Sequence, residues 1–153
     1  MRFEPARVEH AAQLLQDIRP LDLQEVEAST GDPGTTVEMS VRLSHNPWVV
    51  FSDDDRLLCL FGAAPYNLLD NKASPWLLGT THLGRYSKTL TRVAQAYIAE
   101  IREQFPRLEN YVDARNTPSI RWLKRVGFAV DPPRVYGVQR RMFHRFHMGL
   151  EDV

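Results

Sequence analysis

The chain has 153 residues, of which 43% are hydrophobic and 25% are charged, and this composition is typical of one soluble globular domain rather than a disordered or fibrous chain. Lysine plus arginine (19) equals aspartate plus glutamate (19), so the whole chain lacks the basic excess that indicates nucleic-acid binding. The single cysteine, Cys59, excludes an intramolecular disulfide, and no apolar run reaches the length of a membrane span.

The first third of the chain predicts one strand followed by helices. Residues 1–8 alternate loosely and favour a strand, whereas residues 8–30 carry apolar side chains at helical spacing. The predicted apolar stripe is Ala12, Leu15, Ile18, Leu23 and Val26. Pro20 should divide this stretch into two helices or a kinked pair. Residues 35–46 predict another short helix.

The middle of the chain predicts a hairpin and a further strand. Two β-rich apolar runs within residues 47–69 flank "SDDDR", and this pattern is typical of a β-hairpin. The three aspartates of that tip resemble metal ligands, but a tip rich in aspartate more often forms a solvated turn, so we predict no metal. Residues 75–83, "PWLLGTTHL", predict the fourth strand.

The last half predicts two helices that alternate with strands. Residues 87–105 form the strongest helical pattern, with Ser87 as its predicted cap and Pro106 as its end. Residues 107–114 predict a strand. The run "NTPSIRWLKRVGF" predicts a helix with Asn116 and Thr117 as caps and Gly127 as the stop. Residues 128–138 and 140–148 predict the last two strands, with a bend at the paired prolines of the first.

The predicted order is therefore strand, three helices, three strands, helix, strand, helix and two strands. The late alternation requires at least one parallel pair of strands with a crossover helix. This order resembles the GNAT (Gcn5-related N-acetyltransferase) fold over nearly the whole chain. The resemblance implies one α+β domain over residues 1–153, with a central mixed, mostly antiparallel sheet, flanking helices and one parallel pair formed by the fourth and fifth strands.

At residue level the resemblance is strongest in residues 116–128. There Asn116 precedes the helix and Gly127-Phe128 follows it, as in the late motif that this superfamily places beside its cofactor. Residues 4–28 are also similar to a GNAT opening, in which a strand and two helices form one wall of the acceptor groove.

A more specific resemblance links residues 83–128 to a small GNAT-like internal virion protein family of short-tailed bacteriophages. The family's Asn-Tyr-Val strand, Asn-Thr cap and Ile-Arg-x-Leu-Lys helix recur in "LENYVDARNTPSIRWLKRVGF". The resemblance implies a phage-encoded protein in the host bacterial cytoplasm or in the virion, with other virion proteins as its partners. The first residues lack the apolar core of a signal peptide, so we expect no secretion by that route.

The resemblance also implies where acetyl-CoA would bind. In GNAT enzymes the turn after the fourth strand holds the pyrophosphate against backbone N–H groups, with the pattern Gln or Arg, two residues, Gly, one residue, and Gly or Ala. In "THLGRYSK" only Gly84 matches, because Thr81 and Tyr86 occupy the other two positions. The implied cofactor site comprises Gly84, Arg85, Tyr86, Ser87, Lys88 and Asn116.

The residues that would carry out catalysis also match the family pattern incompletely. Many members protonate the leaving thiolate with a tyrosine seven residues after the asparagine, and Leu123 occupies that position here. Loss of a general acid costs typically ~10²–10⁴ in rate, which handicaps an enzyme but does not exclude one. The candidate bases for the acceptor amine are Glu25, Glu27, His45 and His82. We single out Glu25 in the second helical segment and His82 at the end of the fourth strand, where a histidine could act near neutral pH.

Three hypotheses stay open. The fold order, Asn116 and Gly127-Phe128 favour an acyl-CoA-dependent N-acetyltransferase with a degenerate cofactor motif and an unknown acceptor. Tyr86, Leu123 and the phage resemblance favour a non-catalytic virion protein that keeps only the fold. The third is a host-directed binding protein. A splay between the fourth and fifth strands would support the enzyme, and a Tyr86 ring that fills this cleft would count against it.

Overall fold

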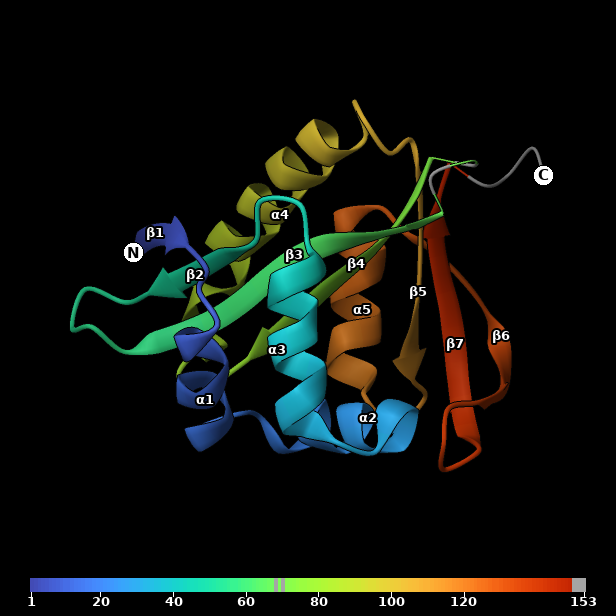
Figure 1. The fold of residues 1–153 in the computed structure, drawn as a ribbon, viewed down its shortest axis with the longest axis horizontal. Helices are drawn as coiled ribbons and strands as arrows, with labels where there is room; N and C mark the ends of the chain where they lie inside the picture. Colours follow the sequence, from blue (N-terminus) through green and yellow to red (C-terminus); the bar gives the residue numbers. More distant parts are fainter. Residues whose placement is uncertain (68, 70, 150–153) are drawn as a thin grey trace.

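The computed structural model describes residues 1–67, 69 and 71–149, and in these residues the predicted order of elements is confirmed (Figure 1). The last four residues of the predicted domain, 150–153, lie outside the described residues. The strands are β1 (Arg2–Pro5), β2 (Trp48–Phe51), β3 (Leu57–Asn67), β4 (Lys72–Gly79), β5 (Arg107–Asp113), β6 (Ala129–Tyr136) and β7 (Arg141–Met148). The helices are α1 (Glu9–Gln16), α2 (Pro20–Thr30), α3 (Pro33–Leu43), α4 (Ser87–Ile101) and α5 (Thr117–Val126), with a short 3₁₀ turn, Gly84–Tyr86, before α4.

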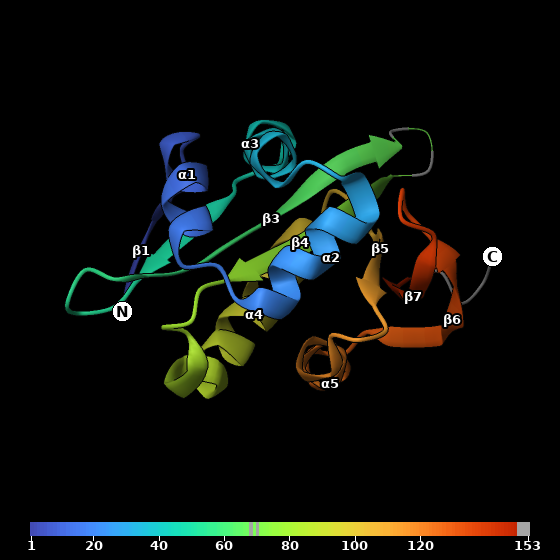
Figure 2. The same ribbon diagram turned by 90° about the horizontal axis from the view of Figure 1, so that it is seen from below.

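The strands form one sheet in the order β1-β2-β3-β4-β5-β7-β6. Among the described pairs only β4 and β5 run parallel, with α4 as the crossover between them. The predicted α+β architecture with its parallel pair of fourth and fifth strands is therefore confirmed. Helices α1 and α3 lie on one face of the sheet, and α4 and α5 lie on the other (Figure 2).

The helix boundaries follow the proline and glycine signals of the sequence. Pro20 is the first residue of α2, and Gly31 ends that helix with a φ of 88°. The Asp32 side chain accepts a hydrogen bond from the Thr35 N–H (3.2 Å) and caps α3. Gly127 ends α5 with a φ of 125°. These left-handed conformations suit glycine because it has no Cβ.

The aspartate-rich tip of the β2–β3 hairpin is a turn, as predicted. Its carboxylates pair with the chain's start: Asp53 contacts the N-terminal amine (2.9 Å) and Asp55 contacts Arg2 (2.6 Å). Across the described part of the chain, no group of three or more His, Cys, Asp or Glu side chains could hold a metal ion. None of the described helices is long and apolar enough to cross a membrane.

Two clusters of buried side chains pack on the two faces of the sheet. On the α4–α5 face they include Leu90, Ile101 and Phe128. On the α1–α3 face they include Leu14 and Val37. The sheet thus separates two hydrophobic cores, and a cavity can connect its two faces only through a gap between strands.

Three details of the predicted first and fourth helices are wrong. Helix α1 buries Ala11 and Leu14, whereas Ala12 is exposed. The helix ends at Gln16, so Ile18 lies outside it and forms an isolated bridge with Thr80. Helix α4 ends at Ile101, five residues before Pro106. Ser87 does not cap α4, because the 3₁₀ turn runs directly into the helix and gives Ser87 helical dihedral angles (φ −60°, ψ −37°).

Candidate functional site

Strands β4 and β5 pair over only two residues and then separate. Lys72 pairs with Arg107, and Ala73 pairs with Leu108, both near the strands' amino-terminal ends. Beyond Ala73 the described residues of the two strands form no further pairs, although β4 continues to Gly79. The sheet therefore contains a V-shaped opening toward the carboxyl ends of β4 and β5.

One asparagine side chain replaces the missing backbone hydrogen bonds near the closed end of the V. The Asn110 amide nitrogen donates to the carbonyl oxygen of Pro75 (2.8 Å), and the Asn110 amide oxygen accepts from the N–H of Tyr111 (2.8 Å). Pro75 has no N–H that would need a partner. Because buried backbone groups need hydrogen-bond partners, these contacts let the two strands part at low cost.

Helix α2 runs across the open end of the V (Figure 1). Asp22 accepts a hydrogen bond from the N–H of Gly79, the last residue of β4 (2.8 Å), and Glu25 accepts one from the N–H of Asp113, the last residue of β5 (2.9 Å). The Asn116 amide nitrogen lies 3.1 Å from Asp22 Oδ1 and 3.3 Å from Glu25 Oε1. We call Asp22, Glu25 and Asn116 the α2 bridge. Its two carboxyl groups share a helix face because they are three residues apart.

Arginines balance two of the three carboxylates at this end of the V. Arg19 pairs with Asp22 (2.7 Å), and Arg115 pairs with Asp113 (2.7 Å). Asp22 and Asp113 are both buried. Burial alone would raise the pKa of Asp113, but the hydrogen bonds from Arg115 outweigh it and hold that pKa below its ordinary value. Both aspartates therefore serve the architecture as ion-paired groups.

Glu25 is different, because it faces a cavity and carries no such arginine. Burial raises the pKa of Glu25 to about 8; the hydrogen bond from the Asp113 N–H opposes this shift, and the nearby charge of Asp22 adds to it. A carboxyl group with a pKa near 8 can exchange a proton near neutral pH, as a general base must. A strongly perturbed carboxyl group in a cleft is also a recognised indicator of a functional site.

The cavity fills the V and has a volume of about 240 Å³. Its lining includes Val26 of α2 and Ser40 of α3 on one face of the sheet, and Ala94 of α4 and Ser119 of α5 on the other. The cavity therefore joins the two faces of the sheet. A ligand that enters from the α4–α5 face would meet a second ligand from the α2–α3 face beside Glu25.

The turn before α4 presents exposed backbone beside basic side chains. A Cβ on Gly84 would meet no atom within 4 Å, so this backbone is open. No hydrogen bond from a described side chain caps the N-terminus of α4, and Arg85 and Lys88 are exposed beside it. A helix start without a side-chain cap and the positive end of the helix dipole favour an anion such as a diphosphate.

The Tyr86 ring does not fill the V. It is half-buried, packs against the core on the α4–α5 face, and is not one of the described residues that line the cavity. Leu123 is buried and lines the cavity, where an aliphatic side chain supplies no proton. The nearby Tyr97 hydroxyl donates to the His45 carbonyl oxygen (2.7 Å), and burial raises its pKa above the ordinary value.

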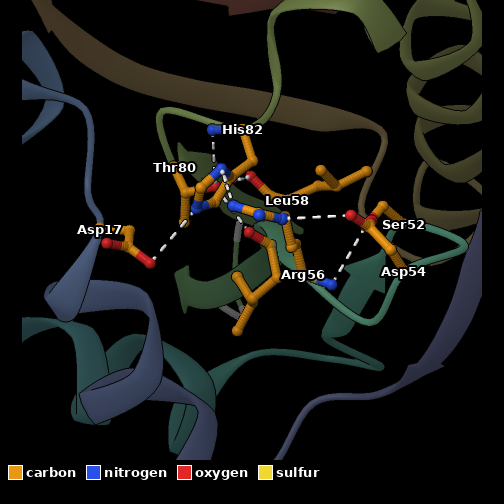
Figure 3. Close-up of polar contacts among 8 residues, drawn as sticks. Asp17, Ser52, Asp54, Arg56, Leu58, Thr80 and His82 are labelled. Carbon is orange, nitrogen blue, oxygen red and sulfur yellow. Dashed lines mark hydrogen bonds and ion pairs between the residues drawn. The ribbon is translucent and has the colours of Figure 1, made fainter.

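His82 belongs to a polar cluster outside the V (Figure 3). Its Nε2 lies 3.3 Å from Asp17 Oδ2, and its Nδ1 lies 3.4 Å from Arg56 Nη1. Its backbone N–H donates to Thr80 Oγ1 (3.3 Å). The cluster borders a second hollow, of about 610 Å³, which Gly84 also lines. Since both ring nitrogens face partners, His82 directs no free lone pair toward the V.

The structure thus groups the residues singled out from the sequence into two places. Glu25 and Asn116 lie in the α2 bridge, and His82 lies beside the turn before α4. Gly84, Arg85, Tyr86, Ser87 and Lys88 form that turn and the start of α4. Their roles stay predictions. Asp22 and Asn110 are not among the residues singled out from the sequence, although the three-residue spacing of Asp22 and Glu25 on α2 is a usable signal.

The chain is similar in structure to GNAT acetyltransferases. A probable acetyltransferase of the GNAT family from Chromobacterium violaceum aligns with a TM-score of 0.69 at 19% identity, over 95% of this chain and 81% of that one. The spermidine N-acetyltransferase of Vibrio cholerae in complex with CoA and spermine aligns with a TM-score of 0.68 at 12% identity, over 96% and 94%. The protein smu.2055 of Streptococcus mutans aligns with a TM-score of 0.67 at 11% identity, over 97% of both chains.

No protein-family model matches the chain, and no curated protein sequence gives a significant match. The structural likeness shows the GNAT fold, so the fold implied by the sequence resemblance is confirmed. The resemblance to the phage virion family stays a prediction.

Proposed function

We propose that this chain is an acyl-CoA-dependent N-acetyltransferase. The observation that carries the proposal is the V between β4 and β5, with a cavity that joins the two faces of the sheet beside the Glu25 carboxyl group. The same fold in a Vibrio cholerae spermidine N-acetyltransferase holds CoA together with spermine. Fold alone does not fix an activity, so the proposal rests on the cavity and its carboxyl group.

The residues of this chain fit a CoA molecule. The open backbone at Gly84 and the uncapped start of α4 suit the diphosphate, with Arg85 and Lys88 as counter-charges. Ala94 and Ser119 line the α4–α5 side of the cavity, where the pantetheine arm would lie. When bound, acetyl-CoA supplies the thioester that the acceptor amine attacks.

Glu25 accepts a proton from the acceptor ammonium in this proposal and leaves a neutral amine inside the V. Glu25 is suited to this step because its pKa is about 8. Leu123 supplies no acid for the thiolate, so most of the acceleration comes from holding the two reactants together. We expect turnover to be slower by about 10²–10⁴ than with a positioned general acid.

Isothermal titration with acetyl-CoA and with free CoA tests the cofactor site. We expect low-micromolar binding that Gly84→Trp abolishes, because the indole would cover the open backbone where the diphosphate lies. Gly84→Ala is the matched control and should bind normally, since a Cβ there meets no neighbouring atom. No binding to the wild-type protein at millimolar ligand would refute the proposal.

The pH dependence of kcat/KM tests the base. We expect kcat/KM to rise with pH up to about 8, in step with the deprotonation of Glu25. Glu25→Gln should lower kcat/KM by about 10²–10⁴ and remove this limb of the profile. A profile that the substitution leaves unchanged would show that another group accepts the proton.

The alternative is a non-catalytic protein of a phage particle, which the replacements at Tyr86 and Leu123 favour. It predicts no CoA binding in the same titration and predicts other virion proteins as partners. Mass spectrometry of purified particles from cells infected with the parent phage would test whether the chain is carried in the virion.

A further inference from the structure

The side chains around the cavity also restrict the acceptor. Among its described lining residues, Glu25 is the only one with a carboxyl group, the group that pairs with an ammonium when it is ionised. The other polar lining residues near it on α2 and α3 are hydroxyl-bearing: Ser29, Thr30, Thr36 and Ser40. The site therefore offers one position for a cationic group and neutral contacts elsewhere.

Aromatic rings form a large part of the cavity wall. Tyr111 and Tyr136 both line the cavity and stack on each other, with ring centroids 4.0 Å apart and an interplanar angle of 13°. The Arg134 guanidinium lies 5.2 Å from the Tyr111 centroid and donates to the Tyr111 hydroxyl, which fixes that ring. Trp76 also lines the cavity, and its indole N–H donates to Ser44 Oγ (2.7 Å).

The Tyr111 hydroxyl and the Trp76 indole N–H thus have polar partners within the protein, and both rings, together with Tyr136, line the cavity. A polyamine would bring a second or third ammonium group into this wall without a carboxylate to receive it. Burying an unpaired charge is costly, so such an acceptor is disfavoured. A flat apolar body would instead gain contact with the rings.

Building on the proposed function, we infer that the acceptor is a small primary monoamine with a flat apolar body, of the arylalkylamine class. Its ammonium group lies at Glu25 and its ring lies against Tyr111, Tyr136 and Trp76. In the transfer the amine nitrogen forms a C–N bond to the acetyl carbon and the C–S bond breaks. The products are an amide and the CoA thiol, and the ammonium group releases one net proton.

The test compares kcat/KM for phenethylamine, butylamine and spermidine with acetyl-CoA as donor. Release of the CoA thiol is followed with a thiol reagent, and the buried Cys59 adds little background. We expect phenethylamine to exceed spermidine by at least about tenfold, and to exceed butylamine by about threefold to tenfold through ring contacts. Equal or better turnover of spermidine would overturn the inference.

Two variants locate the preference in this wall. Tyr136→Leu keeps an apolar side chain but removes a ring, so it should reduce the advantage of phenethylamine over butylamine by about threefold to tenfold. Ser29→Asp places a second carboxylate one helical turn from Glu25, so it should raise relative turnover of 1,4-diaminobutane over butylamine, whereas Ser29→Ala should not. Unchanged ratios in both variants would also overturn the inference.

The titration with CoA separates failure of this inference from failure of the proposed function. Suppose that CoA binds but the protein acetylates spermidine and not phenethylamine, or acetylates none of the tested monoamines. The acceptor class is then wrong, and the cofactor site stands. If CoA does not bind, both are wrong.

Discussion

Protonation of Glu25, a residue that lines the cavity, makes the free energy of unfolding depend on pH. Its pKa is about 8 in the folded protein against an ordinary 4.5, so between these pH values the folded chain holds a proton that the unfolded chain releases. The free energy of unfolding should therefore fall as pH rises through this window, with a slope of at most about 1.4 kcal/mol per pH unit from this group. Glu25→Gln keeps an acceptor oxygen for the Asp113 N–H but does not titrate.

We therefore expect Glu25→Gln to gain stability relative to the wild-type protein as pH rises from about 5 to 8. Urea denaturation of both proteins across this range measures the difference. Glu27→Gln is the matched control, because Glu27 lies on the same helix but is not one of the described residues that line the cavity. Parallel stability curves for Glu25→Gln and the wild type would contradict the assignment of a raised pKa.

At the scale of elements, α2 holds the ends of β4 and β5 in place of strand pairing. Asp22 is central, because its carboxylate accepts hydrogen bonds from Gly79, Arg19 and Asn116. Asn at this position has one acceptor oxygen instead of two and leaves Arg19 without its ion pair. We expect Asp22→Asn to lower the free energy of unfolding by about 2–4 kcal/mol, as measured by urea denaturation.

Asp17→Asn is the matched control for this substitution. Asp17 is more than half exposed, with 57% of its side chain accessible, and it pairs with the half-buried His82 (3.3 Å). The expected loss is below about 1 kcal/mol. If the two variants lose equal stability, then the α2 bridge does not hold the strands as described.

The sequence predicts the elements better than the site, and the reason is the range of the interactions. Pro20, Gly31 and Gly127 act on the backbone within one turn, so their effects can be read from neighbouring residues. The α2 bridge joins Asp22 to Asn116 across 94 positions of the chain, and local periodicity carries no information on such a contact. Asn116 therefore looked like a helix cap, whereas its side chain makes no cap hydrogen bond and donates to α2 instead.

At the scale of the whole molecule, the sheet consists of two parts with a narrow join. From β1 to β4 each strand pairs with the next, and β5, β7 and β6 do likewise. Among the described residues the two parts share only two strand pairs, Lys72–Arg107 and Ala73–Leu108, together with the Asn110–Pro75 hydrogen bond. The cavity lies at this join and separates the two sets of strands beyond it. A ligand in the V would contact both parts at once.

This arrangement predicts a local pattern of amide hydrogen exchange. Peptides that cover residues 76–79 of β4 and 109–113 of β5 should exchange faster than peptides from β3 and β7, because one edge of each strand lacks a strand partner. Acetyl-CoA at about a hundred times its dissociation constant should slow exchange in these peptides by up to about a hundredfold. Peptides from β2, which lies on the far side of β3 from the V, are the internal control. When exchange occurs by local opening, acetyl-CoA should change the exchange rate of these peptides least. Uniform exchange along the whole sheet in the free protein would mean that the V is closed in solution, and the cavity that carries the proposed chemistry would then lack its opening.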